Sequence, residues 1–236
     1  MKNKIYQIRR KLARMCTRVL NNSLKKNKFY NRYVFSKIYK KDLFNLFSTN
    51  KESKSGPGSN LEQTTEIMIK IPELVKKYNI TNVLDLPCGD FYWMSKIDLA
   101  DIEYLGGDIV PEIIKSNKAK FTKNNISFKE INIINESLPK VDLIICRDLF
   151  VHLKNDQILM AIKNIKNSGS KYLLTTSYKS LNHNIDINEI GAWRPLNLEI
   201  PPFNMNNIDD AIFENCTESG GKFNDKYLLL YSVDKL

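Results

Sequence analysis

Val83-Leu-Asp-Leu-Pro-Cys-Gly-Asp90 is the part of the sequence that indicates the class of fold most clearly. An apolar strand runs into Asp85, then into a tight turn with Gly89, and a helix is expected to follow. In doubly wound sheets the ligand crevice lies outside the carboxyl ends of the strands, at such a turn. One glycine instead of a GxGxxG series disfavours a dinucleotide, whose pyrophosphate needs several close-approach glycines. Asp85 also opposes phosphate and suits a cationic ligand, such as the ammonium of a methionyl group.

Short apolar runs alternate with helical segments on the C-terminal side of residue 81. Five such runs cover residues 82–86, 104–107, 126–131, 141–146 and 172–176. Strands that alternate with helices indicate an α/β protein with a doubly wound, mostly parallel sheet. Residues 226–233 form a late strand after an Asn/Gly-rich turn, and we expect it to pair antiparallel at the sheet edge.

A second carboxylate, Asp108, ends the strand Tyr104-Leu-Gly-Gly-Asp108, 23 residues after Asp85. A carboxylate at this position can accept hydrogen bonds from both hydroxyls of a ribose. The alternative is that Asp108 caps the helix over residues 111–121, since Asp is common before helices. Both interpretations remain open.

The series VLDLPCGD, YLGGDIV and VDLIICRDLFVHL resembles the motifs of class I SAM-dependent methyltransferases, over roughly residues 55–236. The chain is most similar to a bacterial subgroup that carries SGxGS, DLPCGD, WRPLNL and PPF, here at Ser55–Ser59, Asp85–Asp90, Trp193–Leu198 and Pro201–Phe203. The resemblance implies a Rossmann-like seven-strand sheet and S-adenosyl-L-methionine (SAM) as the cofactor.

The resemblance also implies a set of cofactor-binding residues. They are Asp85, Pro87, Cys88, Gly89, Asp90, Trp93, Asp108, Ile109, Asn132, Ile133 and Arg147. Asn132 stands where the family usually has an acidic partner for adenine, and its amide oxygen can accept from the adenine amino group. Cys88 stands where the common pattern has glycine, so the turn must tolerate a thiol.

The end of the fourth strand and the segment after it should face the methyl acceptor. His152 is the leading candidate for a general base, because its pKa lies near neutrality. Asp148 is a second catalytic candidate, as a base or as a group that orients the acceptor. Packing for His152 and a helix N-cap for Asp148 are the alternatives. Alignment supplies much of the catalysis of methyl transfer, so the reaction does not strictly require a base.

A long aperiodic stretch after the fifth strand and the glycine-rich segment before the core supply the candidates for acceptor binding. These substrate-binding candidates are Ser59, Tyr178, Trp193 and Arg194. Trp193 and Arg194 offer a flat apolar wall beside a fixed cation, which suits sugars, phosphates or carboxylates. Alternatively, Trp193 buries the loop and Arg194 pairs with a core acid. Residues 55–59 are either a cover over the cofactor or a linker.

The positive charge is concentrated at one end of the 236-residue chain. Residues 1–54 carry 16 Lys and Arg against two acids, whereas the remainder has a net charge of −4. We therefore divide the chain into a basic, amphipathic, helical N-terminal segment (residues 1–50) and a methyltransferase domain (51–236). Apolar residues recur at helical spacing at Ile5, Ile8, Leu12, Met15, Val19 and Leu20. We expect this apolar stripe to pack on the core. The alternatives are that residues 1–20 contact a membrane surface or that the basic segment binds a polyanion.

The composition of the chain disfavours several classes of protein. There is no apolar run of about 18 residues and no signal-peptide pattern, so we expect a cytoplasmic protein. The four cysteines are far apart, and with two histidines the sequence makes no case for a metal. We expect methyl transfer, with oxygen favoured, to a small polar metabolite or glycan precursor, in bacterial surface polysaccharide (capsule) synthesis. The rivals are an RNA methyltransferase and a catalytically silent SAM-binding module; nucleic acid is the less favoured partner.

Overall fold

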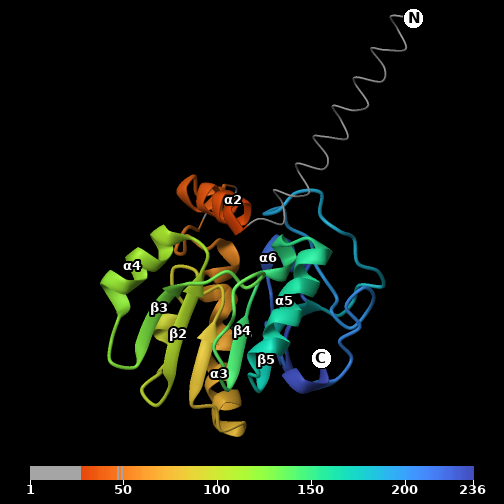
Figure 1. Ribbon diagram of the computed structural model, residues 1–236. Helices are drawn as coiled ribbons and strands as arrows, with labels where there is room; N and C mark the ends of the chain where they lie inside the picture. The colour runs from red at the N-terminus through yellow and green to blue at the C-terminus, as the bar shows by residue number, and fades with distance from the viewer. Residues whose placement is uncertain (1–27, 47, 49) are drawn as a thin grey trace, which may run out of the picture.

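A seven-stranded sheet forms the centre of the computed structural model, which describes residues 28–46, 48 and 50–236. The strand order is β3-β2-β1-β4-β5-β7-β6 (Figure 1). The strands are β1 (Asn82–Asp85), β2 (Glu103–Asp108), β3 (Ile126–Glu130), β4 (Leu143–Cys146), β5 (Tyr172–Tyr178), β6 (Ile208–Phe213) and β7 (Lys226–Ser232). Strands β1 to β5 are parallel to one another, and β7 is antiparallel to both of its neighbours. The prediction of a doubly wound, mostly parallel sheet with a late antiparallel strand is confirmed.

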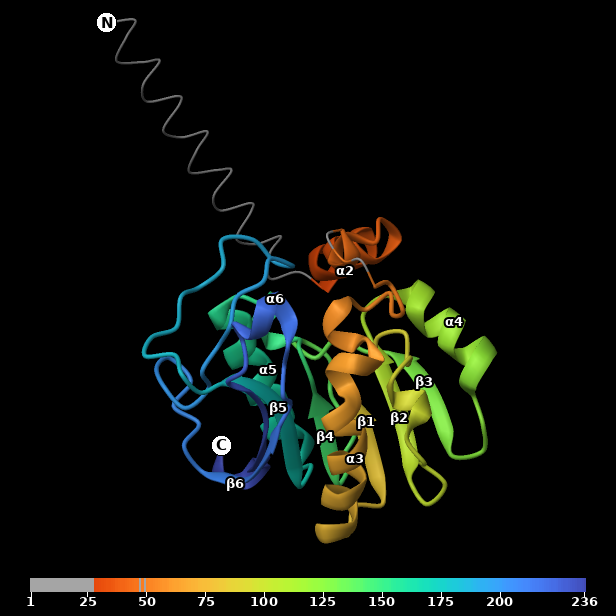
Figure 2. The ribbon, with the colours of Figure 1, turned by 180° about the vertical axis from the view of Figure 1, so that it is seen from behind.

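Helices cover both faces of the sheet (Figures 1 and 2). The α-helices are α2 (Lys28–Lys40), α3 (Leu61–Lys77), α4 (Pro111–Phe121), α5 (Asn155–Ser168) and the short α6 (Glu218–Gly221). The 3₁₀ turns are η1 (Leu43–Asn45), η2 (Pro57–Ser59), η3 (Met94–Lys96), η4 (Phe150–His152) and η5 (Val233–Lys235). Helix α3 packs on one face, and α5 packs on the other.

Both faces of the central strands are buried, so apolar residues occur there in succession, as in Leu143–Cys146 of β4. Successive side chains of a strand point to opposite faces. In β1, Val83 belongs to the same apolar cluster as Ile71 of α3, whereas Leu84 belongs to the cluster that contains Ile158 and Ile165 of α5. The two clusters form the two layers of the core.

The end of the sheet that contains β7 and β6 differs from the expected arrangement. Strand β7 is antiparallel as predicted, but it lies between β5 and β6 and not at the edge. The edge strand is β6, which the sequence pattern did not reveal as a strand. Its sequence, IDDAIF, has two adjacent acids and one fully buried side chain, Ile212. Charged side chains are typical of edge strands and weaken the apolar signal.

Helix α2 lies across the carboxyl ends of the strands (Figure 1). Residues 28–40 of the basic segment are therefore helical, as predicted. A turn and η1 follow this helix. The amphipathic helix predicted around residues 5–20 lies outside the described residues. Among the helices that the structure describes, none is both long and apolar enough to cross a membrane.

Candidate active site

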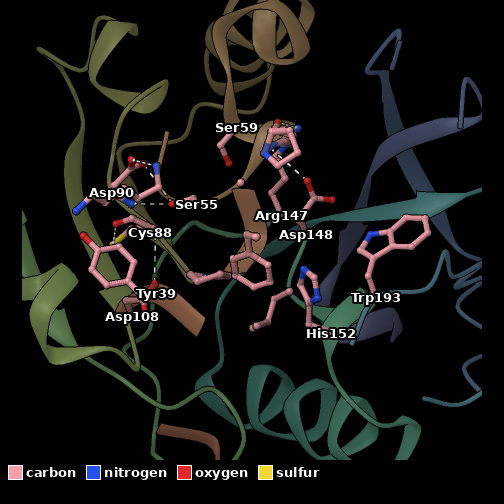
Figure 3. A pocket seen from close by; sticks show the side chains of 18 of the residues that line it. Tyr39, Ser55, Ser59, Cys88, Asp90, Asp108, Arg147, Asp148, His152 and Trp193 are labelled. Carbon is pink, nitrogen blue, oxygen red and sulfur yellow. Dashed lines mark hydrogen bonds and ion pairs between the residues drawn. The ribbon is translucent and has the colours of Figure 1, made fainter. Parts of the chain in front are cut away.

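A cavity of about 490 Å³ opens at the carboxyl ends of the parallel strands (Figure 3). The last residue of each of three strands lines it: Asp85 of β1, Asp108 of β2 and Tyr178 of β5. Arg147 lines it directly after β4. The cavity therefore occupies the crevice in which doubly wound sheets bind their ligands.

The turn after β1 forms the floor of this cavity. Pro87, Cys88, Gly89, Asp90 and Trp93 all line it, as does Ile109 after β2. Gly89 has a φ of 52°, and a Cβ at this position would lie 2.2 Å from Ser55 Oγ. The turn therefore requires glycine both for its backbone conformation and for its close contact with the segment before the core.

Asp85 and Asp108 are buried carboxyl groups on adjacent strands. Asp85 Oδ2 accepts a 2.6 Å hydrogen bond from the Tyr104 hydroxyl, and burial raises the pKa of Asp85 to about 7. Asp108 accepts from the backbone N–H groups of Val110 (2.9 Å) and Gly89 (3.3 Å), and burial raises its pKa to about 6. The N-cap of α4 is Val110, so Asp108 is not the cap that the sequence allowed.

Asn132 and Ile133 line a small cavity that adjoins the main one at the end of β3. Asn132 Oδ1 accepts from the backbone N–H of Ile134 at 2.9 Å. Asn132 Nδ2 is buried and has no partner among the described residues. The sequence suggested an acceptor for adenine at this position, but the group left free is a donor. An unsatisfied buried donor is costly, which favours a ligand that accepts from it.

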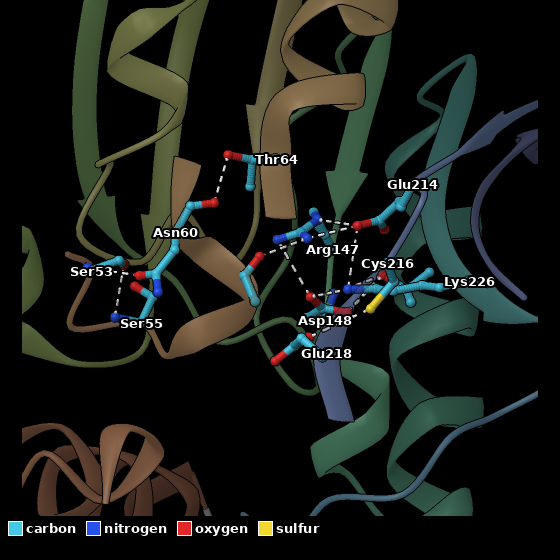
Figure 4. A network of polar contacts seen from close by, with 12 residues as sticks. Ser53, Ser55, Asn60, Thr64, Arg147, Asp148, Glu214, Cys216, Glu218 and Lys226 are labelled. Atoms are coloured by element: carbon cyan, nitrogen blue, oxygen red, sulfur yellow. Dashed lines mark hydrogen bonds and ion pairs between the residues drawn. The ribbon is translucent and has the colours of Figure 1, made fainter. Parts of the chain in front are cut away.

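Arg147 belongs to a buried ion network, which we define as Arg147, Asp148, Glu214 and Lys226 (Figure 4). Glu214 Oε2 accepts from Arg147 Nε (3.1 Å) and Nη2 (2.7 Å) and lies 3.3 Å from Lys226 Nζ. Arg147 Nη2 also donates to the Gly58 carbonyl at 2.8 Å. The guanidinium that was predicted to bind the cofactor thus joins β4 to the end of β6 and to the segment before the core.

Asp148 is the fourth member of this network. Lys226 Nζ lies 2.7 Å from Asp148 Oδ2, and the backbone N–H of Asp148 donates to the Thr176 hydroxyl. Burial acts to raise the pKa of Asp148, but the charges of Lys226 and Arg147 outweigh it and hold that pKa well below its usual range. Leu149, not Asp148, is the N-cap of η4. Asp148 is neither the expected helix cap nor a good proton acceptor near neutral pH.

His152 lines the cavity on η4, and its ring centroid lies 4.8 Å from that of Phe44. Its Nδ1 is 3.1 Å from the Ala192 carbonyl oxygen. A carbonyl can only accept, so we assign the proton to Nδ1, which leaves Nε2 with a free lone pair. Burial lowers the pKa of His152. The imidazole is therefore neutral near pH 7 and is able to accept a proton.

The acceptor-binding candidates separate into two groups. Ser59, Tyr178 and Trp193 line the cavity, whereas Arg194 does not. Arg194 donates to the carbonyl oxygens of Phe150 (2.7 Å) and Ile185 (3.2 Å) and to the side chain of Asn155 (3.0 Å). The side chain expected as a fixed cation beside Trp193 instead holds the long loop to η4 and α5.

Three aromatic rings form one side of the cavity, which we call the aromatic wall: Tyr178, Trp193 and Phe223. The Trp193 and Phe223 centroids are 4.7 Å apart, and Tyr178 lies edge-on to both rings. Trp193 remains 43% exposed. Glu218 lines the cavity as well, and burial raises its pKa. Sequence reasoning missed Phe223 and Glu218, which lie in a region without periodic signal.

The glycine-rich segment before the core is a wall of the cavity and not merely a linker. Ser53 Oγ (2.9 Å), the Lys54 N–H (2.8 Å) and Ser55 Oγ (3.2 Å) all donate to the Asp90 carboxylate. Asp90 N–H donates in return to Ser55 Oγ at 3.0 Å. Asp90 was predicted to bind the cofactor, and in this structure its carboxylate holds the segment in place (Figure 3).

No protein-family model matches the chain, and a search of the curated proteins found no match. Solved structures do match. The N-methyltransferase NodS from Bradyrhizobium japonicum WM9, in complex with S-adenosyl-L-homocysteine (SAH), aligns with a TM-score of 0.58 and 14% identity over 83% of this chain and 96% of its own. Magnesium protoporphyrin IX methyltransferase (ChlM) from Synechocystis PCC 6803, with bound SAH, aligns with a TM-score of 0.57 and 14% identity over 86% of this chain and 97% of its own. The chain therefore has the Rossmann-like fold of class I SAM-dependent methyltransferases.

Proposed function

We propose that this protein is a SAM-dependent methyltransferase that acts on a small polar metabolite or a glycan precursor, with a hydroxyl oxygen as the acceptor. One observation carries the proposal: two buried carboxyl groups, Asp85 and Asp108, end adjacent strands and face one cavity. The two structural neighbours described above hold SAH, which supports the same class of ligand in this cavity.

The residues present fit SAM. Asp85 would accept from its ammonium group, and the carboxylate of Asp108 would accept from the ribose hydroxyls. The unpartnered amide N–H group of Asn132 would donate to a ring nitrogen of adenine. Bound SAM supplies a methyl group on a sulfonium, which is already a good leaving group.

The chain's own contribution to the transfer is to orient the acceptor and to hold its proton. The neutral His152 can take the proton of an acceptor hydroxyl at Nε2, while the Ala192 carbonyl keeps its ring in place. The aromatic wall and the carboxylate of Glu218 offer an apolar surface beside hydrogen-bond acceptors. This combination suits a hydroxylated ring and supports a sugar, such as a building block of a surface polysaccharide.

Titration calorimetry with SAH tests cofactor binding. We expect the wild-type chain to bind, and Asp108→Asn to weaken binding by about tenfold or more, because a hydrogen bond to a charged group contributes about 1.5–3 kcal/mol. Asp98→Asn, at an exposed aspartate after η3, is the matched control and should bind as the wild type does. A wild-type chain that does not bind SAH would overturn the proposal.

Turnover is tested by following SAH release from SAM in the presence of hydroxylated acceptors, including nucleotide-linked sugars. Release that depends on the acceptor supports the enzyme. SAH binding without release on any acceptor of the panel would favour the catalytically silent module instead, since a fold does not guarantee an activity.

A further inference from the structure

Helix α2 and the turn after it carry three aromatic side chains that line the main cavity: Phe35, Tyr39 and Phe44. None of them belongs to the motifs at the strand ends. In Figure 3, Tyr39 lies beside Cys88 and Asp108, on the opposite side of the cavity from Trp193. An element that precedes the core in sequence therefore closes the cavity over the ends of β1 and β2.

Contacts with three separate parts of the core hold α2 in this position. Asn31, which is buried, accepts from Gln157 of α5 at 3.2 Å. At the β3 end, Arg32 pairs with Glu130 at 2.6 Å. On the third side, Ile38 packs against Gly191, where a Cβ would lie 2.5 Å from Ile38 Cδ1. The position of α2 is thus specified by polar, ionic and steric contacts together.

Phe35 joins the two cavities. It lines the main cavity and also the small adjoining one that contains Asn132 with its unpartnered amide nitrogen. Its side chain is buried and packs in the core cluster of the α5 face. An apolar ring next to a free hydrogen-bond donor is the pair of features that a flat heterocycle with ring nitrogens requires.

Tyr39 lies within range of the charges of Asp90, in the turn after β1, and of Asp108, at the end of β2. Burial, followed by the charges of Asp90 and Asp108, raises the pKa of its phenol, so the hydroxyl stays protonated and can donate. Lys54 Nζ lies 5.5 Å from the centroid of the Tyr39 ring, which brings the glycine-rich segment and α2 together at this point. The Tyr39 side chain lies near Asp108, the carboxylate proposed to bind ribose, and both line the main cavity (Figure 3).

We propose that α2 is part of the cofactor site, with Phe35 against the adenine ring and Tyr39 against the ribose of bound SAM. This inference rests on the proposed function. The strand ends bind the cofactor from one side and α2 covers it from the other, so the adenosine half is enclosed. The acceptor must then approach from the side of the aromatic wall.

The test is the affinity for SAH of α2 variants, measured by titration calorimetry. Phe35→Ala should weaken binding about tenfold or more, because a buried aromatic contact is lost. Tyr39→Phe should weaken it about threefold to tenfold, through the loss of one hydrogen bond. Tyr33 on the same helix is 63% exposed, and Tyr33→Phe and Tyr33→Ala should bind SAH as the wild type does.

Two further measurements separate contact with the ligand from damage to the fold. Phe35→Leu keeps the site apolar without a ring, and it should unfold in urea near the wild-type midpoint while binding SAH less tightly. Phe35→Ala and Tyr39→Phe should lose affinity for 5′-methylthioadenosine by the same factors as for SAH. This ligand has the adenosine half of SAH but lacks its amino acid.

The outcomes for this inference and for the proposed function differ. Wild-type affinity in folded Phe35→Ala and Tyr39→Phe variants would overturn the role of α2 and leave the methyltransferase proposal standing. The role of α2 would also be overturned if the variants bound SAH more weakly than the wild type but bound 5′-methylthioadenosine equally well. Failure of the wild-type chain to bind SAH would overturn both.

Discussion

The pKa values of Asp85 and Asp108 show how burial would set the pH at which this site could bind a cationic ligand. Their raised pKa values, about 7 and about 6, mean that the folded state binds protons more tightly than the unfolded state does. Their contribution to stability is therefore present at low pH and is lost as the pH rises through these pKa values. A cationic ligand reverses this loss, because it stabilises the ionised carboxylates.

We therefore predict that SAH affinity increases with pH between 5 and 8. Below pH 7, Asp85 must lose a proton before it can pair with the ligand ammonium, which costs up to about tenfold in affinity per pH unit. Calorimetry across this range should show the increase, together with proton release on binding at pH 6. Asp85→Asn, which has no proton to lose, should show a flatter profile. An affinity of the wild type that is constant from pH 5 to 8 would contradict the pairing.

His152 is the residue with which to test base catalysis. Replacing it, in His152→Gln, should lower kcat by about 10²–10⁴-fold and leave SAH affinity unchanged. The wild-type rate should fall at acidic pH as His152 becomes protonated, at a pKa below the ordinary value for histidine, and the variant should lose this dependence. His183→Gln, at the exposed second histidine, is the control. Equal rates for the two variants would show that alignment alone suffices.

At the scale of elements, the buried ion network joins the ends of three strands. Arg147 and Asp148 follow β4, Glu214 follows β6, and Lys226 begins β7. Two cations and two carboxylates neutralise one another there, and Arg147 also holds the Gly58 carbonyl. The network therefore connects the antiparallel part of the sheet to the wall of the main cavity.

Lys226→Met should destabilise the protein by about 3–5 kcal/mol, because it leaves the carboxylates of Asp148 and Glu214 partly uncompensated in the interior. Lys77→Met is the matched control, since Lys77 pairs with Asp210 at 2.8 Å on the surface; its cost should be about 0–1 kcal/mol. Urea unfolding monitored by tryptophan fluorescence measures both. If the two variants lost similar amounts of unfolding free energy, Lys226 in the network would contribute no more to stability than a surface ion pair does.

At the scale of the whole molecule, the docking of α2 depends on a glycine far from it in sequence. Gly191 has a φ of 86°, and a side chain there would meet Ile38 of α2. Gly220 has a φ of 69°, and no other group lies within 4 Å of the point that its Cβ would occupy. Substitution by alanine strains the backbone at both positions, but only at Gly191 does it also push on α2.

We predict that Gly191→Ala loosens α2 and that Gly220→Ala does not. Trypsin should cleave at the lysines near the end of α2, Lys37, Lys40 and Lys41, faster in Gly191→Ala than in Gly220→Ala, because local undocking exposes that segment. SAH affinity should fall in the same order if α2 covers the cofactor. Identical cleavage rates in the two variants would show that the contact with Gly191 does not hold α2.

Much of the fold and part of the site could be predicted from local pattern. The parallel strands contain short apolar runs, such as Leu143–Cys146 of β4, and Asp85 and Gly89 mark the turn after β1. Strand β6 was not predicted, because it is an edge strand whose two adjacent aspartates interrupt the apolar pattern. The local pattern left the role of Arg194 open, because an arginine in a loop has the same local signature whether it faces a ligand or, as here, three carbonyl and amide oxygens.

The five parallel strands and the two carboxylates follow from the sequence alone, because strand ends and apolar runs are local properties. Which residues surround those carboxylates, and where β6 and β7 join the sheet, follows only from the packing of the folded chain. Phe35 and Asn132 are about a hundred residues apart in the chain and line one small cavity, and Glu214 and Lys226 meet Arg147 across the sheet. Such pairings depend on the long-range packing of α2, β6 and β7, for which no short window of sequence carries a signal.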